Sequence, residues 1–373
     1  MFTERLVRAQ SLRPEPEAMV EDLKQQFLRL GSSPAGIILF RGPAYDDQRL
    51  ASALLAAFDC PVASCTTAGE IFDSYGEGGA VGVAFSPRYF AFHQLEMPQL
   101  ASYDFQHLPG QAQAILDRQI LPGARRFGLL LVDGLSILEE SLVGQVHRAF
   151  QGIPMIGGSA GDNLAFGRTR VLCNGHYQEN AATFTVVESL LPFETLRIQH
   201  FECSSQDLVI TRSDPARRIV YEIDGAPAAR QLASLLNIGV EELSPQVFSK
   251  YPMMLQIGEE WYVRSVQKVN PDGSLSFFCA IDDGLPLTLA HGVGLVETLN
   301  QEVERVERDF ARVHLTLGVD CVLRRLEIQE NALGARVEPL LHRLRFCGFS
   351  SYGEQFQSLH VNQTLTAVVL GEK

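Results

Sequence analysis

The feature that most constrains the fold is a motif that occurs twice. Residues 60–71 read Cys-Pro-Val-Ala-Ser-Cys-Thr-Thr-Ala-Gly-Glu-Ile, and residues 153–163 read Ile-Pro-Met-Ile-Gly-Gly-Ser-Ala-Gly-Asp-Asn. Each copy opens with Pro near its start, continues with a short β-forming run, and closes on Ala-Gly followed by a carboxylate. Pro suits the first residue of a strand, and Gly lets backbone approach backbone or a ligand closely. Each copy therefore predicts a strand that ends in a tight turn of small residues.

The surroundings of the two copies are also alike. An apolar strand and a helical pattern precede each copy, at residues 36–58 and 127–150, and two further strands follow each copy. In the second helical pattern, Glu139 and Glu140 fall in the first turn, where the helix dipole favours carboxylates. Residues of roughly 30 to 190 therefore predict a duplicated β-α-β-β-β unit, which we expect to form two mixed sheets packed face to face with helices outside.

The remainder of the chain predicts a second mixed α+β domain. A chain of 373 residues is long enough for two domains, and we place them at residues 1–190 and 191–373. Hydrophobic spacing predicts an amphipathic helix at Glu15–Leu30 and one long helix at Leu287–Val313. Residues 322–346 read as mostly helix, and residues 365–370 as a final strand. The expected fold class is therefore α+β throughout.

Composition excludes several kinds of partner and compartment. The formal net charge of −13 argues against nucleic acid, because phosphate binding depends on clustered Lys and Arg. The sequence has no apolar run of 18 residues and no signal peptide, which favours a cytoplasmic protein without a membrane segment. The seven cysteines are odd in number and form no Cys-x-x-Cys pair, which favours reduced thiols over a disulfide framework or a zinc site.

The chemistry of the repeated turns is open to two interpretations. Their free N–H groups and small residues could cradle a polar ligand or could simply allow close packing. The candidate ligand-binding residues are Thr66, Thr67, Gly69, Ser159, Gly161 and Asp162. Cys65 could be a reactive centre, although a buried thiol is the commoner role, and Glu70 with Asp162 could be an acid–base pair, although carboxylates that cap turn N–H groups are commoner. No local nucleophile or metalloprotease motif occurs, so we expect no enzyme.

Several spaced motifs resemble a known family. Residues 65–71, 132–136 and 157–162 resemble the N-terminal FIST domain, a bacterial sensory module. Residues 224–228, 270–275, 320–325, 348–354 and 360–365 are similar, in order, to the C-terminal FIST domain. The resemblance covers nearly the whole chain, and it implies a signal-transduction receptor for a small ligand that acts through a partner.

The resemblance implies two alternative ligands. One branch of stand-alone FIST proteins binds haem and senses nitric oxide, and it regulates a partner histidine kinase or a cyclic-di-GMP enzyme. The absence of a fused output domain and the form of residues 320–325 around Cys321 favour that branch here. The alternative is a haem-free receptor for an amino acid or another small metabolite, and a scaffold that recruits a partner is a third class. A homodimer is left open.

Haem would need an axial ligand, an apolar pocket and cations for the propionates. His176 is the first choice as the ligand of the haem iron, because it stands at a turn between two strands of the second copy. The alternative ligands are His291, His314, His360 and Cys60. Arg324 and Arg325 could hold the propionates or, in the haem-free alternative, a carboxylate of the ligand.

Overall fold

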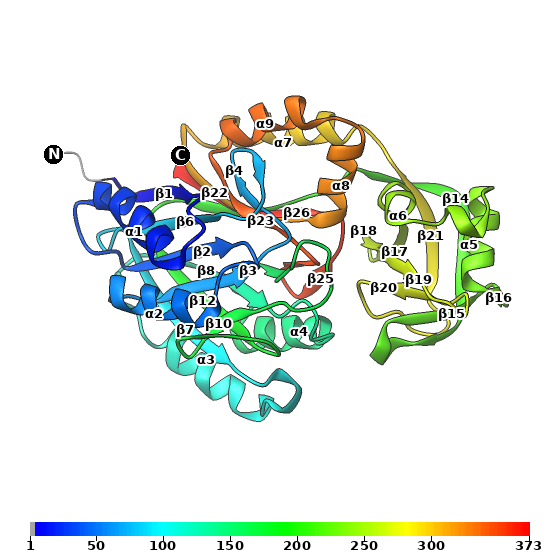
Figure 1. The fold of residues 1–373 in the computed structure, drawn as a ribbon, viewed down its shortest axis with the longest axis horizontal. Helices are drawn as coiled ribbons and strands as arrows, with labels where there is room; N and C mark the ends of the chain where they lie inside the picture. Colours follow the sequence, from blue (N-terminus) through cyan, green and yellow to red (C-terminus); the bar gives the residue numbers. More distant parts are fainter. Residues whose placement is uncertain (1–3) are drawn as a thin grey trace.

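The chain has a mixed α+β fold, as the sequence predicts, in two spatially distinct parts (Figure 1). The computed structural model describes residues 4–373. Three six-stranded sheets form the larger part, which we call the body. A fourth, eight-stranded sheet, which we call the inserted sheet, comes from residues between 201 and 292 and lies to one side of the body.

The body contains three copies of one unit within the described residues, one more than the sequence predicts. The strands and crossover helix of unit 1 are β2 (Gly36–Arg41), α2 (Asp47–Ala57), β3 (Val62–Thr66), β4 (Glu70–Phe72), β5 (Tyr75–Gly76), β6 (Ala80–Phe85) and β7 (Phe90–Met97). Those of unit 2 are β8 (Arg125–Val132), α4 (Glu139–Ala149), β9 (Met155–Ser159), β10 (Val171–Cys173), β11 (His176–Gln178), β12 (Ala182–Ser189) and β13 (Phe193–Ile198). Those of unit 3 are β22 (Arg312–Cys321), α8 (Val322–Glu330), α9 (Gly334–Arg343), β23 (Phe346–Ser351), β24 (Glu354–Phe356), β25 (Leu359–Val361) and β26 (Leu365–Glu372).

Pairing within the three units follows one scheme. The first strand of each unit, β2, β8 or β22, pairs in parallel with the strand after the crossover helix, β3, β9 or β23. On its other side it pairs antiparallel with β6, β12 or β26. A parallel pair needs a long crossover connection, which is why a helix separates its two strands in every copy.

Each unit gives its short hairpin to another unit. The β4–β5 hairpin of unit 1 extends the sheet of unit 3, β10–β11 of unit 2 extends the sheet of unit 1, and β24–β25 of unit 3 extends the sheet of unit 2. The edge strands are exchanged as well, since β7 joins the sheet of unit 2 and β13 joins that of unit 3. The first strand of the chain, β1 (Leu6–Ser11), completes the sheet of unit 1. The body is therefore a ring of three sheets with pseudo-threefold symmetry.

The sheets share one core and carry helices on their outer faces. The central cluster combines buried side chains of all three units, among them Phe40, Phe127 and Phe349. Outside the first sheet pack α1 (Pro16–Phe27) and α2, and outside the second pack α3 (Leu108–Leu116) and α4. Outside the third sheet pack α7 (Leu295–Asp309) and α9. The amphipathic pattern predicted for the opening segment is confirmed by α1, which buries Met19, Leu23 and Phe27.

The inserted sheet has its own core. Its elements are β14 (Phe201–Asp214), β15 (Ile219–Ile223), β16 (Ala226–Pro227), α5 (Ala228–Leu236), α6 (Pro245–Lys250), β17 (Met253–Ile257), β18 (Glu260–Arg264), β19 (Val266–Val269), β20 (Leu275–Phe277) and β21 (Pro286–Gly292). Side chains such as Leu208, Val220 and Leu232 form a separate buried cluster there. The chain enters this part through residues 199–200 and leaves it through residues 293–294.

Two features differ from the sequence-based description. The single helix expected at 287–313 is wrong, because residues 286–292 form strand β21 and helix α7 begins only after Gly294, whose φ is 45°. The boundary expected near residue 190 falls between β12 and β13, and strands from both sides of it pair with each other, β9 with β24 in the sheet of unit 2 and β4 with β23 in that of unit 3. In residues 4–373, no helix combines the length and the apolar character needed to cross a membrane.

Candidate functional site

The turns that close β3, β9 and β23 meet at one end of the body. We call them turn 1 (residues 66–70), turn 2 (residues 159–162) and turn 3 (residues 350–354). The backbone N–H of Ala68 donates to the carbonyl of Ser350 at 2.8 Å, which joins turn 1 to turn 3. Tyr352 donates to Ser159 at 3.2 Å, and Gly161 donates to Thr66 at 3.1 Å. The three turns therefore exchange backbone hydrogen bonds in a closed cycle.

Each turn ends in a carboxylate, and the three carboxylates are Glu70, Asp162 and Glu354. Glu70 accepts the N–H of Gly79 at 3.1 Å, and Asp162 accepts three backbone N–H groups at 2.7–2.9 Å. Glu354 accepts the N–H of Thr364 at 3.1 Å. The interpretation of Glu70 and Asp162 as turn caps is therefore confirmed.

The environment of these carboxylates differs. Burial raises the pKa of Glu70, and it raises the pKa of Glu354 to about 8. Burial also acts to raise the pKa of Asp162, but its hydrogen bonds from backbone N–H groups and from Tyr352 outweigh burial and leave that pKa below its usual value. The environment therefore favours the charged form of Asp162 and the protonated form of Glu354.

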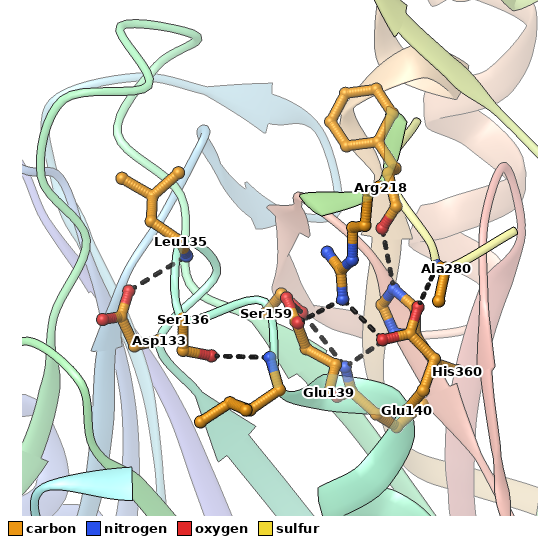
Figure 2. Close-up of polar contacts among 12 residues, drawn as sticks. Asp133, Leu135, Ser136, Glu139, Glu140, Ser159, Arg218, Ala280 and His360 are labelled. Atoms are coloured by element: carbon orange, nitrogen blue, oxygen red, sulfur yellow. Dashed lines mark hydrogen bonds and ion pairs between the residues drawn. The ribbon is translucent and has the colours of Figure 1, made fainter. Parts of the chain in front are cut away.

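A buried ion-pair cluster links these turns to the inserted sheet (Figure 2). Glu139 and Glu140 begin helix α4, and Arg218 lies just before strand β15. The Nη2 atom of Arg218 lies 2.5 Å from Oε2 of Glu139 and 2.6 Å from Oε2 of Glu140. Arg218 is buried, and the two carboxylates outweigh the effect of burial and raise its pKa. The two parts of the molecule thus meet at a buried contact of opposite charges, in addition to the more exposed ion pairs Arg197–Glu260 and Lys250–Glu330.

Further hydrogen bonds extend this contact into turn 2. Ser159 donates from Oγ to Oε1 of Glu139 at 3.3 Å, and Gln355 donates from Nε2 to Oγ of Ser159 at 3.1 Å. On the other side, the backbone N–H of Ala280 donates to Oε1 of Glu140 at 2.8 Å. His360 lies with Nε2 3.3 Å from the carbonyl of Phe278, which also belongs to the inserted part.

Aromatic side chains border the same junction. Phe166 stacks on Tyr352 with ring centroids 4.6 Å apart, and it lies 6.1 Å from the ring of Phe278. The hydroxyl of Tyr352 donates to Oδ1 of Asp162. Phe166 is 37% exposed and has a left-handed φ of 49°, which is uncommon for a bulky residue. The junction thus combines two carboxylates, a guanidinium and an accessible aromatic face.

A second buried network lies where the chain crosses between the two parts. The Nη1 atom of Arg324 lies 2.9 Å from Nδ1 of His200, and Nε2 of His200 lies 2.9 Å from Oε2 of Glu327. Because Arg can only donate, Nδ1 of His200 must accept, so Nε2 carries the proton and donates to Glu327. Arg324 also donates to Asp320 at 2.7 Å. Since the carbonyl of His200 accepts the N–H of Val293 at 2.7 Å, this network holds both crossing segments together.

The structure brings together the predicted ligand-binding residues of the repeat. Thr66, Thr67, Ser159 and their neighbours all lie in turns 1 and 2, and both threonines are buried. Cys65 is fully buried, and burial raises the pKa of its thiol, in line with the interpretation as a packed thiol. The sequence reading missed Glu354 and Arg218. The sequence Ser-Tyr-Gly-Glu at 351–354 carries the Gly-acid signal of the other turns, whereas no local pattern marks Arg218.

The residues predicted to hold haem are not brought together. His176 is exposed at the tip of the β10–β11 hairpin, in the sheet of unit 1. Arg324 and Arg325 begin helix α8, where Arg324 pairs with Asp320 and Arg325 pairs with Glu77 and donates to the carbonyl of Ala68. The hollow beside the hairpin, lined by Cys60, Leu55 and Gly175, holds about 150 Å³. That volume is below the roughly 300–1,000 Å³ of sites for drug-sized ligands, so the hollow next to Cys60 is small for a porphyrin.

The alternative ligands differ in their surroundings. His360 is buried against Phe278, and His314 lies 3.1 Å from Glu372 and 3.0 Å from Arg5. His291 is exposed and lines an apolar hollow of about 350 Å³ together with Leu235, Leu236, Val247, Tyr251 and Leu289. Among the predicted histidines, His291 therefore has the surroundings that best suit a large apolar ligand.

The fold and the junction define a two-part mixed α+β protein whose parts meet at a polar contact, and domain interfaces are preferred places for small ligands. The family profile of the FIST N domain matches residues 35–226, and that of the FIST C domain matches residues 228–357. The chain belongs to the FIST family, whose domains are associated with sensory signal transduction. No curated protein matches the chain.

Proposed function

We propose that the chain is a non-catalytic sensory receptor for a small zwitterion such as an amino acid, which binds where Arg218 meets Glu139 and Glu140. The observation that carries this proposal is the buried contact of opposite charges between the inserted sheet and the body. A zwitterion presents one carboxylate and one ammonium group. The carboxylate matches the guanidinium fork of Arg218, and the ammonium matches the carboxylates at the start of α4.

The neighbouring groups suit the rest of such a ligand. Phe166 offers a partly exposed aromatic face beside the junction, and Asp162 supplies a further negative charge in turn 2. A ligand that competes for Arg218 would replace the contacts between the two parts with contacts to itself. The position of the inserted sheet would then depend on the ligand, because a ligand shifts a conformational equilibrium by its differential affinity for the two states.

The crossing segments provide the route by which this change reaches a partner. Residues 199–200 and 293–294 are the two connections to the inserted sheet, and the network around His200 anchors both to helix α8. Rotation of the inserted sheet about these segments would either move helix α8 with them or break the contacts of His200 with Arg324 and Glu327 on that helix. A signalling partner such as a histidine kinase would bind differently to the two positions of α8.

The test is calorimetric titration of the protein with each of the twenty amino acids, together with thermal unfolding in their presence. A ligand that binds the folded state raises the unfolding temperature by mass action. We expect one chemical group of amino acids to bind, and we expect Arg218→Gln and Glu140→Gln to weaken that binding. Arg212→Gln is the matched control, since Arg212 lies in the same sheet and pairs with Glu222 at 3.3 Å, within that sheet. Equal affinity in Arg218→Gln and Arg212→Gln would overturn the proposed site.

Haem is a second candidate ligand, favoured by one observation. His291 lines the apolar hollow of about 350 Å³ beside Tyr251. Haem needs an axial ligand, such as an imidazole, and an apolar pocket for the porphyrin. Bound haem would supply an iron that can take nitric oxide. The test is uptake of haem followed by its Soret absorption in His291→Ala, with His176→Ala as the control on an exposed hairpin. Unchanged uptake in His291→Ala would exclude this residue as the ligand.

A further inference from the structure

A group of arginines gathers far from the junction, at the opposite end of the third sheet. Arg312 is the first residue of β22, Arg345 directly precedes β23, and Arg5 directly precedes β1. Together with His314 and the carboxylates Glu4 and Glu372, they line a hollow of about 590 Å³. Strand β1 and the C-terminus, beside which Arg5 and Glu372 lie, are on the side of the body away from the inserted sheet (Figure 1).

The charges in this hollow do not cancel. Glu372 lies 2.5 Å from Arg5 and 3.1 Å from His314, and Glu4 lies 3.9 Å from Arg29, which is outside the hollow. Within residues 4–373, neither Arg312 nor Arg345 forms an ion pair with a carboxylate. The hollow therefore contains two guanidinium groups that no carboxylate of the described residues pairs with.

The backbone holds Arg345 in place. Its φ is 51°, a left-handed value that an ordinary side chain adopts only when its surroundings require it. Its Nε donates to the carbonyl of His314 at 3.1 Å, which leaves the two terminal amino groups of the guanidinium free for a ligand. Burial, followed by the nearby charges of Arg8 and Arg312, lowers the pKa of Arg345.

We propose that this hollow is a binding site for a small molecule that carries a phosphate or pyrophosphate group. A guanidinium group can donate two parallel hydrogen bonds to the oxygens of one phosphate, and both Arg312 and Arg345 have N–H groups that are free to donate. The volume lies within the range of small-molecule sites. Arg312 begins strand β22, which ends at Cys321. At about 3.3 Å per residue this strand is about 30 Å long, so the hollow at its start is separate from the junction at the other end of the body.

The test is calorimetric titration with inorganic pyrophosphate at physiological ionic strength. We expect the wild-type protein to bind, and we expect the double variant Arg312→Gln/Arg345→Gln to bind about tenfold more weakly or worse, because each charge-assisted hydrogen bond is worth more than about 1.4 kcal/mol. The matched control is Arg336→Gln/Arg343→Gln, whose guanidinium groups pair with Glu297 and Glu307 on the neighbouring outer helices. These four side chains are exposed or largely so, and circular dichroism would verify that both variants are folded.

A third variant gives an effect of opposite sign. Glu372→Gln removes the carboxylate that competes for Arg5 and His314, so we expect tighter binding of pyrophosphate. The proposal is overturned if the wild-type protein does not bind at concentrations up to about 5 mM. It is overturned equally if the double variant and its control lose the same affinity, or if Glu372→Gln weakens binding.

Discussion

The backbone N–H of Gly161 donates to the carbonyl of Thr66 at 3.1 Å, and this bond joins the second turn of the body to the first. The approach is so close that a Cβ atom on Gly161 would lie 2.6 Å from the backbone nitrogen of Ala68. Real Cβ atoms do not come this near to backbone. The small residue of the repeated motif is therefore required for packing at this position, whatever ligand the neighbouring residues bind.

Gly161→Ala should destabilise the protein. The added methyl group meets backbone atoms of turn 1 that cannot move independently, and overpacking of this kind costs about 1–3 kcal/mol. The free energy of unfolding in urea measures the effect. Gly110→Ala is the control, since Gly110 lies in helix α3 and no atom lies within 4 Å of its added Cβ. We expect that change to stabilise by about 0.5–1 kcal/mol, because Ala is the better helix former. If Gly161→Ala and Gly110→Ala changed the free energy of unfolding in the same direction, this account would be wrong.

Arg218→Ala should lower stability more strongly. It leaves the carboxylate of Glu139, which is 1% exposed, without its buried partner. Removing one member of a buried pair costs about 3–5 kcal/mol. Arg343→Ala breaks the more exposed pair with Glu307 and should cost at most about 1 kcal/mol. Urea unfolding of both variants gives the comparison, and a loss in Arg218→Ala no larger than in Arg343→Ala would show that the junction does not hold the two parts together.

Glu354 should make the protein less stable as pH rises. Burial raises its pKa in the folded state to about 8, above the ordinary carboxyl value near 4.5, so the folded state binds the proton more tightly than the unfolded state. Its contribution is therefore fully present below about pH 4.5 and is lost as pH rises through about 8. Relative to the wild-type protein, Glu354→Gln should become steadily more stable between pH 5 and pH 8. A stability difference between Glu354→Gln and the wild-type protein that stays constant over this pH range would refute the assignment.

His200 should act in the opposite direction. Burial lowers its pKa in the folded state, despite the hydrogen bond to Glu327, so the unfolded state binds the proton more tightly. Stability should therefore fall as pH decreases below the ordinary His pKa near 6.5. In His200→Asn, the decrease in unfolding free energy between pH 7 and pH 5 should be smaller than in the wild-type protein. A slope in His200→Asn as steep as in the wild-type protein would show that this histidine does not titrate with folding.

The repeated turns could be predicted because their pattern is short and local. The third copy was missed since Tyr352 replaces the Ala of the motif, two helices replace one, and the inserted sheet separates unit 3 from unit 2. The exchange of hairpins was not predictable, because it depends on pairing between strands far apart in the sequence. Arg218 was missed for the same reason, as its partners on α4 come from another part of the chain. His176 was chosen for its position at a turn, and nothing in a turn sequence tells whether a pocket lies beside it.

The exchange of hairpins also has a consequence for synthesis of the chain on the ribosome. The sheet of unit 3 needs strand β4, which is made as part of unit 1, and strand β26, which is the last strand of unit 3. The sheet of unit 2 cannot be completed until β24 and β25 have emerged. The ring therefore closes only after all three units have been translated, and its long-range contacts favour slow folding. Until then, the unpaired edges of the first units are exposed, and a chaperone that shields strand edges would find its substrate in the nascent chain.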